Sequence, residues 1–303
     1  MQQPSYRPAT AILITVLIGI FPAALSAQSF WLERSYGKTV MLEIFKPKVS
    51  GGAYNGVNYP VDYSFKTFAL FLTLRSQIGS KSFLVVELPF AHASFDTKIY
   101  TDFSFYRNSG YSNTIGNPYI GLERGSLNSR FFTEIGLRLP LAKTDNNYAA
   151  TVGRAADPDR REAFENYAAL RAMVNYRSKR TKGLTFRARG GVVVQRDFDH
   201  RGDNYFSLPI DAQIGYGYET GRFRLGVNLV IRIATDYQSY NSGIYRGGSF
   251  KMNQTQHLRL RGSVRLGSLR LGAYLKPPFG DSERANSFNF KRSSFGLDLA
   301  MQR

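Results

Sequence analysis

The sequence of 303 residues contains no cysteine, one tryptophan and three histidines. Without cysteine the chain can form neither disulfide bonds nor the thioether linkage of a lipoprotein, and it offers no thiolate to a metal. The histidines, His92, His200 and His257, are far apart in the sequence and lack the spacing of metal ligands. The sequence therefore predicts no metal site and no cofactor.

Long apolar runs are also scarce, and the one that exists lies near the start of the chain. It extends from Ala9 to Leu25, follows the basic Arg7, and precedes the small residues Ser26 and Ala27. This order is typical of a secretory signal peptide, whereas the competing interpretation, a membrane anchor, requires a longer run. We predict a cleaved signal peptide over residues 1–27 and a single domain over residues 28–303.

Acidic residues are few. Asp and Glu number 22 against 40 Lys and Arg, which gives a formal net charge of +18, or +17 once Arg7 is removed with the signal. A charge of this size can attract nucleic acid. The arginines, however, recur at alternate positions within strand-like segments, and an exported protein seldom meets nucleic acid. We therefore predict no nucleic-acid partner.

Apolar and polar residues alternate along most of the remaining chain. Between Arg222 and Thr235 every odd position from Phe223 to Ile233 is apolar, while most even positions are polar or small. A period of two places the apolar side chains on one face of a strand. The same pattern predicts twelve strands, at residues 36–46, 64–78, 82–92, 114–124, 130–142, 166–178, 184–195, 205–219, 222–235, 255–266, 269–277 and 293–302.

Short and long connections alternate between these strands. Glycine-containing turns at 79–81, 125–128, 178–183, 220–221 and 267–268 alternate with loops at 47–62, 93–113, 143–165, 196–204, 236–254 and 278–292. This alternation is typical of an outer-membrane barrel with short periplasmic turns and long extracellular loops. Lipid would cover the apolar face, and closure would leave no strand edge unpaired.

The predicted fold class is therefore all-β, a closed antiparallel transmembrane β-barrel of about 12 strands. A soluble β-sandwich is the alternative, because its strands also alternate. The barrel interpretation places the protein in the outer membrane of a Gram-negative bacterium. Its expected partners are outer-membrane lipid, a small solute, and the barrel-assembly machinery during biogenesis.

The side chains at every second position of each strand are expected to face lipid. These positions carry leucine, isoleucine and valine without a charge, for example at Leu70, Leu137 and Leu258. Aromatic residues of the same parity gather at the strand ends, as belts at the two membrane interfaces would. We place Phe131, Tyr176, Tyr216, Tyr218 and Phe223 near the periplasmic side, and Phe90, Phe206, Tyr237, Phe279 and Phe295 near the outer side.

The side chains at the other positions point inward and are expected to line the lumen with two charged walls. The basic wall consists of Arg224, Arg232, Arg259, Arg261, Arg265, Arg270 and Lys276; Arg138, Arg171, Arg187 and Arg189 share its inward parity. The acidic wall consists of Glu87, Glu123 and Glu134, with Glu43 and Asp298 where the first and last strands meet. In a ring of twelve strands these walls face each other.

Two outcomes follow from such walls. If they are close, guanidinium and carboxylate groups form bidentate pairs and close the lumen. If they remain apart, the arginines line a water-filled path that attracts anions. We favour the open path, because cations outnumber carboxylates and repel one another.

No catalytic site is predicted. The nearest candidate pair, His257 and Ser263, lies on one strand, six residues apart. At 3.3 Å per residue the separation is roughly 20 Å, too far for a base to activate a nucleophile.

A segment of the middle of the chain resembles a known family. Residues 115–123 read Ile-Gly-Asn-Pro-Tyr-Ile-Gly-Leu-Glu, residues 136–141 read Gly-Leu-Arg-Leu-Pro-Leu, and residues 86–90 read Val-Glu-Leu-Pro-Phe. These segments resemble outer-membrane transporters of the MetA-pathway phenol-degradation type. The resemblance implies a channel for small hydrophobic or aromatic compounds and supplies no catalytic residues.

The function predicted from the sequence is a passive outer-membrane channel for small, anionic solutes, and not an enzyme. One alternative is a closed structural or adhesion barrel whose extracellular loops bind a partner. The other is the channel for hydrophobic or aromatic compounds that the resemblance implies.

Overall fold

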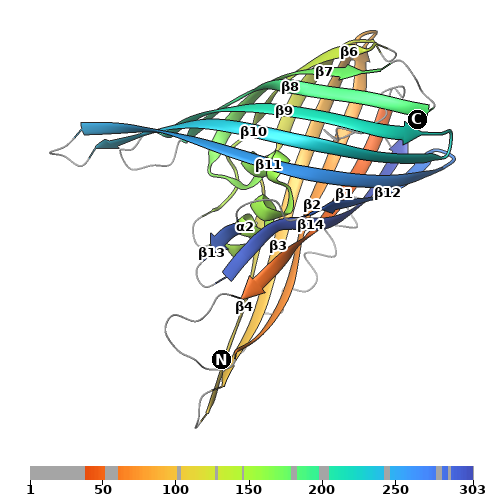
Figure 1. Ribbon diagram of the computed structural model, residues 1–303. Coiled ribbons are helices and arrows are strands. Elements are labelled where there is room, and N and C mark those ends of the chain that lie inside the picture. Colours follow the sequence, from red (N-terminus) through yellow and green to blue (C-terminus); the bar gives the residue numbers. More distant parts are fainter. Residues whose placement is uncertain are drawn as a thin grey trace.

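The computed structural model describes residues 38–51, 61–100, 104–126, 129–144, 147–178, 183–197, 205–241, 246–277, 282–285 and 288–302. The predicted signal peptide lies outside these residues. Of the fourteen strands in the sheet, β4 (Phe105–Ile115) and β13 (Ser282–Ala285) pair beside its main ring. The other twelve close on themselves through antiparallel pairing of the first strand with the last, in which Val40 lies opposite Met301 (Figure 1).

The twelve strands of the ring confirm the predicted barrel. Closure excludes the alternative of two stacked sheets. The ring consists of β1 (Lys38–Gly51), β2 (Val61–Gly79), β3 (Ser82–Tyr100), β5 (Tyr119–Arg124), β6 (Phe131–Arg138), β7 (Tyr167–Arg177), β8 (Gly183–Asp197), β9 (Tyr205–Glu219), β10 (Phe223–Asn241), β11 (Arg246–Leu266), β12 (Leu269–Lys276) and β14 (Phe288–Gln302).

One predicted strand differs. The segment 114–124 does not run continuously, because β4 ends at Ile115 and β5 begins at Tyr119, although both pair with β3. The interruption falls at Gly116, Asn117 and Pro118. Proline has no amide hydrogen to donate to a sheet ladder, which favours a break here.

The two faces of the sheet have the polarity expected of a barrel in lipid. Along β5 and β6 the outward Ile120, Ile135 and Leu137 are 48%, 52% and 41% exposed, whereas the inward Glu123 and Glu134 are buried. A soluble sheet would show the reverse. Lipid tails are the medium in which an apolar exterior of this kind is stable.

Aromatic rings form a row on the exterior at the short-turn end. Ring centroids are 4.8 Å apart for Phe131 and Tyr176, 5.9 Å for Tyr176 and Phe186, and 5.0 Å for Phe186 and Tyr216. Rings in this position form one interfacial belt. Of the residues predicted for the other belt, Phe206 and Phe295 are exposed, while Phe279 and the side chain of Tyr237 lie outside the described residues.

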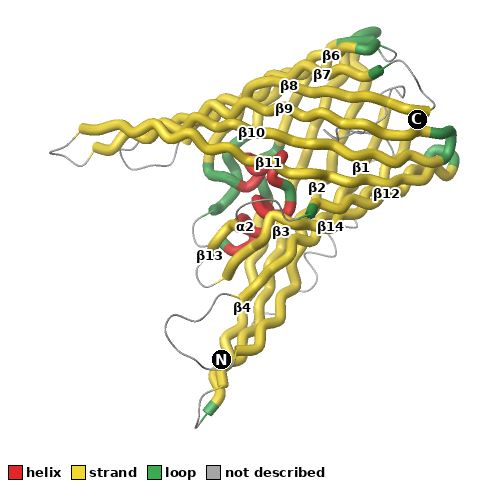
Figure 2. The backbone as a smooth tube through the Cα atoms, viewed as in Figure 1, coloured by secondary structure: helices red, strands yellow, loops and turns green. Residues whose placement is uncertain are grey.

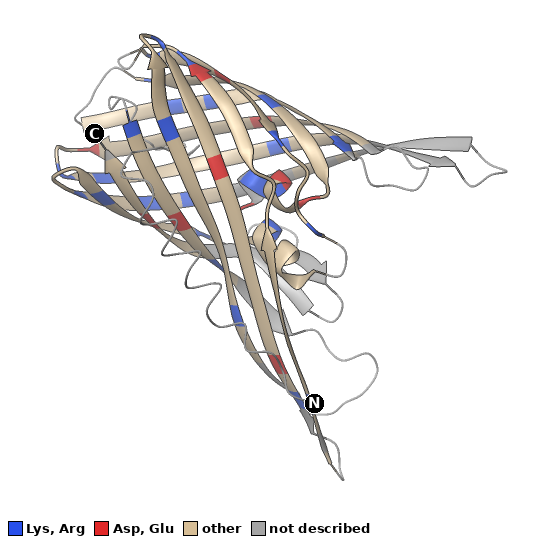
Figure 3. Cartoon of the chain, turned by 180° about the vertical axis from the view of Figure 1, so that it is seen from behind, with Lys and Arg blue, Asp and Glu red and all other residues tan. Residues whose placement is uncertain are grey.

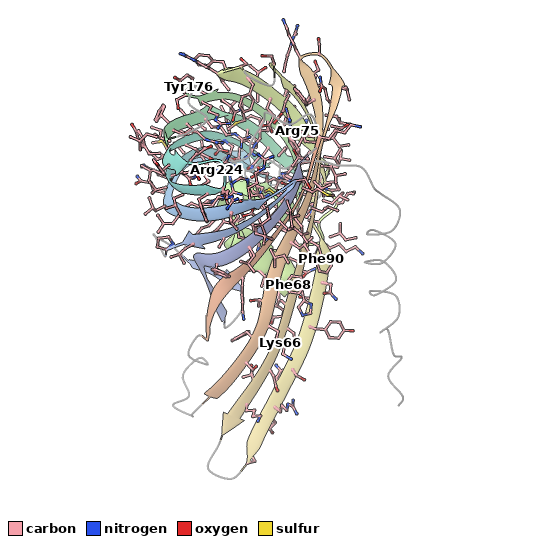
Figure 4. All side chains as sticks on the ribbon, turned by 90° about the vertical axis from the view of Figure 1, so that its right-hand side faces the viewer. Lys66, Phe68, Arg75, Phe90, Tyr176 and Arg224 are labelled. Atoms are coloured by element: carbon pink, nitrogen blue, oxygen red, sulfur yellow. The ribbon has the colours of Figure 1, made fainter. Side chains whose placement is uncertain are left out.

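The two ends of the barrel differ, as the alternating connections predicted. Tight turns at one end contain Gly125 and Gly267, whose φ angles of 151° and 63° suit glycine. At the other end β10 and β11 remain paired as far as Asn241 and Arg246, and β2, β3 and β4 extend together away from the ring (Figure 1). Phe90, Phe68 and Lys66 follow one another along this second extension (Figure 4).

The loop between β6 and β7 folds into the barrel. It contains the helix α2 (Tyr148–Ala156) and the short 3-10 helix η1 (Pro158–Phe164), and we call residues 147–165 the plug (Figure 2). Asp157 followed by Pro158 favours the start of a short helix at η1, because proline suits the first helical position. Among the described residues no helix has both the length and the apolar character needed to cross a bilayer.

Candidate functional site

The plug has an apolar contact with one side of the lumen. The inward side chains on β1, β2 and β3 are unusually apolar there and include Phe45, Phe71 and Ala91. Val152 and Phe164 of the plug belong to the same buried cluster, and the rings of Phe71 and Phe164 meet edge to face at 5.7 Å. Burial of these groups stabilises the plug inside the barrel.

Asn117, in the break between β4 and β5, bonds to the end of the plug and to the segment that leads into it. Its side-chain Nδ2 donates to the carbonyl oxygens of Glu162 at 2.9 Å, Glu165 at 2.5 Å and Tyr167 at 3.3 Å. Its Oδ1 accepts hydrogen bonds from the amides of Leu141 and Ala142, at 2.7 and 2.8 Å. The side chain is thereby bonded to the segment that enters the barrel and to the one that leaves it.

The neighbouring glycine permits this close approach. A Cβ atom at Gly116 would lie 2.3 Å from the carbonyl oxygen of Ala163 and 2.8 Å from Cγ of Pro89. No side chain fits there unless the backbone moves. The motif Gly116-Asn117-Pro118 thus breaks the strand, admits the plug and bonds to it.

Arg160 of the plug reaches the acidic side of the lumen. Its Nη1 donates to Glu43 at 2.6 Å and to Glu87 at 2.9 Å, and its guanidinium lies 3.7 Å from the ring centroid of Phe71. All of these groups are buried. Removal of one partner would leave an uncompensated buried charge, which makes this contact costly to break.

Two plug carboxylates reach the basic side. Asp157 lies 3.0 Å from Nη2 of Arg259 and 2.5 Å from Nζ of Lys276. Glu162 lies 3.0 Å from Arg171 and 3.2 Å from Arg232, so that the plug neutralises part of the basic wall.

The environment of Glu162 favours the ionised carboxylate. Burial raises its pKa, but the charges of Arg171, Arg232 and Arg138 outweigh burial and lower the pKa from 4.5 to about 2. Glu162 is therefore charged at neutral pH.

The predicted basic wall lies inside the barrel. Arg224 pairs with Glu219 at 3.1 Å, Arg261 with Asp298 at 2.7 Å, and Arg270 donates to the hydroxyl of Ser263 at 3.2 Å. Six of its seven members are at most 8% exposed: Arg224, Arg232, Arg259, Arg261, Arg270 and Lys276. Arg265 differs, because it lies beside the turn at Gly267, donates to the carbonyl of that glycine at 2.9 Å, and is partly exposed.

The predicted acidic wall also lies inside, and its members have partners on their own side. Glu87 bonds Arg138 at 2.5 Å, Glu123 bonds Arg75 at 2.7 Å, and Glu134 accepts from the hydroxyl of Tyr119 at 2.6 Å. A further bond, from Arg189 at 3.0 Å, reaches Glu134.

The burial of both walls corrects the open path that we favoured. Each wall is partly neutralised by neighbouring strands and by the plug, and among the described residues side chains fill the lumen at the level of the walls, which is the closed outcome. The reason is tertiary: a loop distant in sequence supplies the missing carboxylates.

Two inward carboxylates were missed by the sequence analysis. Asp211 lies 2.8 Å from Arg232, and Glu219 pairs with Arg177, Arg187 and Arg224. Both share the inward parity of β9, which alternates without interruption, so parity alone was a sufficient signal. The plug carboxylates had no comparable signal, because loop residues have no parity.

The charge asymmetry across the lumen persists after these pairs are counted. Among the described residues, β7 to β12 carry nine buried cations, namely Arg171, Arg187, Arg189, Arg224, Arg232, Arg259, Arg261, Arg270 and Lys276, against buried Asp211 and Glu219. Strands β1 to β6 carry buried Arg75 and Arg138 against Glu43, Glu87, Glu123 and Glu134, and β14 carries buried Asp298, which pairs with Arg261. Figure 3 shows these charges distributed along the barrel strands.

The solved structures that resemble this chain do so at low sequence identity. No protein-family model matches the sequence, and no curated protein matches it. The COG4313 outer membrane channel from Pseudomonas putida F1 matches 88% of this chain and 95% of its own, with 13% identity and a TM-score of 0.49. The beta domain of the Bordetella autotransporter Brka matches 88% and 99%, with 10% identity and a TM-score of 0.45.

A third solved structure, the deltaS2 mutant of the TodX monoaromatic hydrocarbon channel, matches 86% of this chain and 88% of its own. The identity is 11% and the TM-score 0.38. Likeness at this level does not bear on function. The resemblance of residues 115–123 to MetA-pathway transporters has no family match behind it and stays an expectation.

Proposed function

We propose that this protein is an outer-membrane channel for the passive passage of small anionic solutes, and that the plug closes it. The apolar exterior with its aromatic row supports a membrane location. The single observation that carries the anion preference is the imbalance on β7 to β12, nine buried cations against two buried carboxylates. When the plug leaves, its Asp157 and Glu162 leave with it, and the exposed wall attracts anions.

Planar-bilayer recording across a KCl gradient tests this proposal. The sign of the reversal potential reports whether chloride or potassium carries the current. We expect chloride to dominate during openings of the wild-type channel. Potassium preference, or no openings even when the plug is deleted, would remove the proposal.

Matched variants test whether the chloride preference arises from charges in the lumen. Arg224→Gln with Arg270→Gln removes two inward charges, and Glu219 keeps Arg177 and Arg187 when Arg224 is lost. Arg130→Gln with Arg222→Gln removes two exposed charges near the same end. Chloride preference should fall in the first variant and change little in the second, since exposed charges are screened by salt.

A second candidate is a closed barrel that binds a partner at its long-loop end. The observations that favour it are the filled lumen and the two extensions, the β10–β11 hairpin and the β2–β3–β4 ribbon. The loop 143–165 cannot be the binding surface in this state, because residues 147–165 fold into the barrel. Removing residues 96–109 should then abolish partner binding, and the bilayer should record no current before or after.

A further inference from the structure

Each plug carboxylate on the basic side lies among three cations. Asp157 contacts Arg259 at 3.0 Å, Lys276 at 2.5 Å and Arg160 of the plug itself at 2.6 Å. These residues are at most 4% exposed. The two cations on the wall come from neighbouring strands, β11 and β12.

Glu162 occupies a second cluster, in which all three cations come from barrel strands. Arg171 on β7 lies at 3.0 Å, Arg232 on β10 at 3.2 Å and Arg138 on β6 at 3.7 Å. All three are buried, and each also pairs with a strand carboxylate: Arg171 and Arg232 with Asp211, and Arg138 with Glu87. The strands fix these cations, whereas the carboxylate reaches them on a loop.

We propose that these two clusters are binding sites for the carboxylate groups of solutes, that Asp157 and Glu162 occupy them as internal ligands, and that the preferred solute carries two carboxylates. Arginine presents a planar fork that matches a carboxylate, and buried cations require an anionic partner. A free dicarboxylate has the chemistry to replace both plug groups together. The transport of that solute, though not its binding, rests on the proposed channel function.

An internal ligand competes with a free one. A carboxylate tethered by a short segment has an effective concentration in the millimolar range. In the wild-type protein a free dicarboxylate must compete with the plug carboxylates at that effective concentration. Removal of the plug charges should therefore strengthen binding of the free solute without any new contact.

Titration calorimetry with succinate, on the full chain in detergent, measures this effect without requiring conduction. We compare the wild type, Asp157→Asn with Glu162→Gln, and Glu165→Gln. The last is the matched control, because Glu165 pairs with Arg161 within the plug and acts on Arg232 less strongly than Glu162 does. We expect the double variant to bind succinate at least about tenfold more tightly than the wild type, and the control to stay within about twofold.

A reversible lock provides a second measurement that leaves the charges intact. The hydroxyl of Ser112 on β4 accepts a hydrogen bond from the amide of Ala149 in the plug at 2.9 Å, so the two residues are neighbours. Ser112→Cys with Ala149→Cys is therefore the pair chosen for a disulfide, and thiol titration checks that it forms. The chain has no other cysteine to interfere. Succinate should bind the reduced protein and fail to bind the oxidised one.

Equal succinate affinity in the wild type and the folded double variant would overturn the proposal. Undiminished binding to the oxidised lock would overturn it as well. If succinate binds as expected but the bilayer shows no anion current, the channel function fails and the two sites stand. An anion current without succinate binding to any variant would overturn the two binding sites and leave the channel function standing.

Discussion

Asn117→Ala is the substitution that most directly tests whether the plug is held from the strand break. The alanine removes an amide that bonds to Glu162, Glu165 and Tyr167 on one side and to Leu141 and Ala142 on the other. The backbone bond from the amide of residue 117 to the carbonyl of Ala163, at 2.6 Å, does not depend on the side chain. Of these side-chain contacts only the bond to Tyr167, the first residue of β7, involves a barrel strand, so the effect should fall mainly on the plug.

The magnitude follows from the hydrogen-bonding capacity of one amide. It has two donor hydrogens and two acceptor positions. At about 0.5–1.5 kcal/mol net for each bond, their loss lowers the free energy of plug opening by about 2–6 kcal/mol. Since about 1.4 kcal/mol is tenfold, the open population should rise by about one to four powers of ten.

Hydrogen exchange of the amides in α2 reports that population directly. We expect exchange of residues 149–156 to accelerate in Asn117→Ala, while the amides of β9 and β10 keep their protection. Asn113→Ala is the matched control, because Asn113 is exposed and its side chain bonds only His92 among the contacts described, at 2.7 Å. Equal protection of α2 in both variants would refute the assignment of Asn117 as the residue that holds the plug.

Two further predictions concern charge. The pKa of Glu162 is lowered to about 2 from 4.5, so its contribution to plug closure is complete above pH 4.5 and is lost as the pH falls through about 2. The difference in hydrogen exchange of α2 between the wild type and Glu162→Gln should therefore be constant from pH 7 to 4.5 and shrink below pH 4.5. A difference that shrinks instead between pH 7 and 5 would contradict this. Leu137→Arg puts a charge on the lipid face and should lower the free energy of unfolding in lipid by about 2–4 kcal/mol. Leu184→Arg, near the short-turn end, should lower it by about 0–1 kcal/mol. Equal losses for the two variants in a denaturant titration would argue against lipid on this face.

Much of the barrel was predictable because strand parity is a local property. The alternation between Arg222 and Thr235 places Leu225 and Leu229 outside and Arg224 and Arg232 inside, and the structure confirms both faces. The alternation of short and long connections likewise predicted an even number of antiparallel strands. These signals lie within a few residues of one another, so a single sequence contains them.

The positions of the two charged walls also followed from parity, but their state did not. Parity shows that Arg259 and Lys276 point inward, whereas nothing near them in the sequence indicates that Asp157, more than 100 residues away, pairs with both. Whether the lumen is open or filled depends on that contact. The favoured open path was wrong for this conformation for this reason.

The sequence by itself determined which face of each strand meets lipid, because the backbone of a strand turns successive side chains to opposite sides. Only the tertiary structure decided what occupies the interior. Asn117 breaks a strand, admits a loop and bonds to both of its ends, and the loop then brings carboxylates to cations that its own strands leave in excess. Such contacts join segments distant in sequence, and their free energy exists only once the barrel has closed.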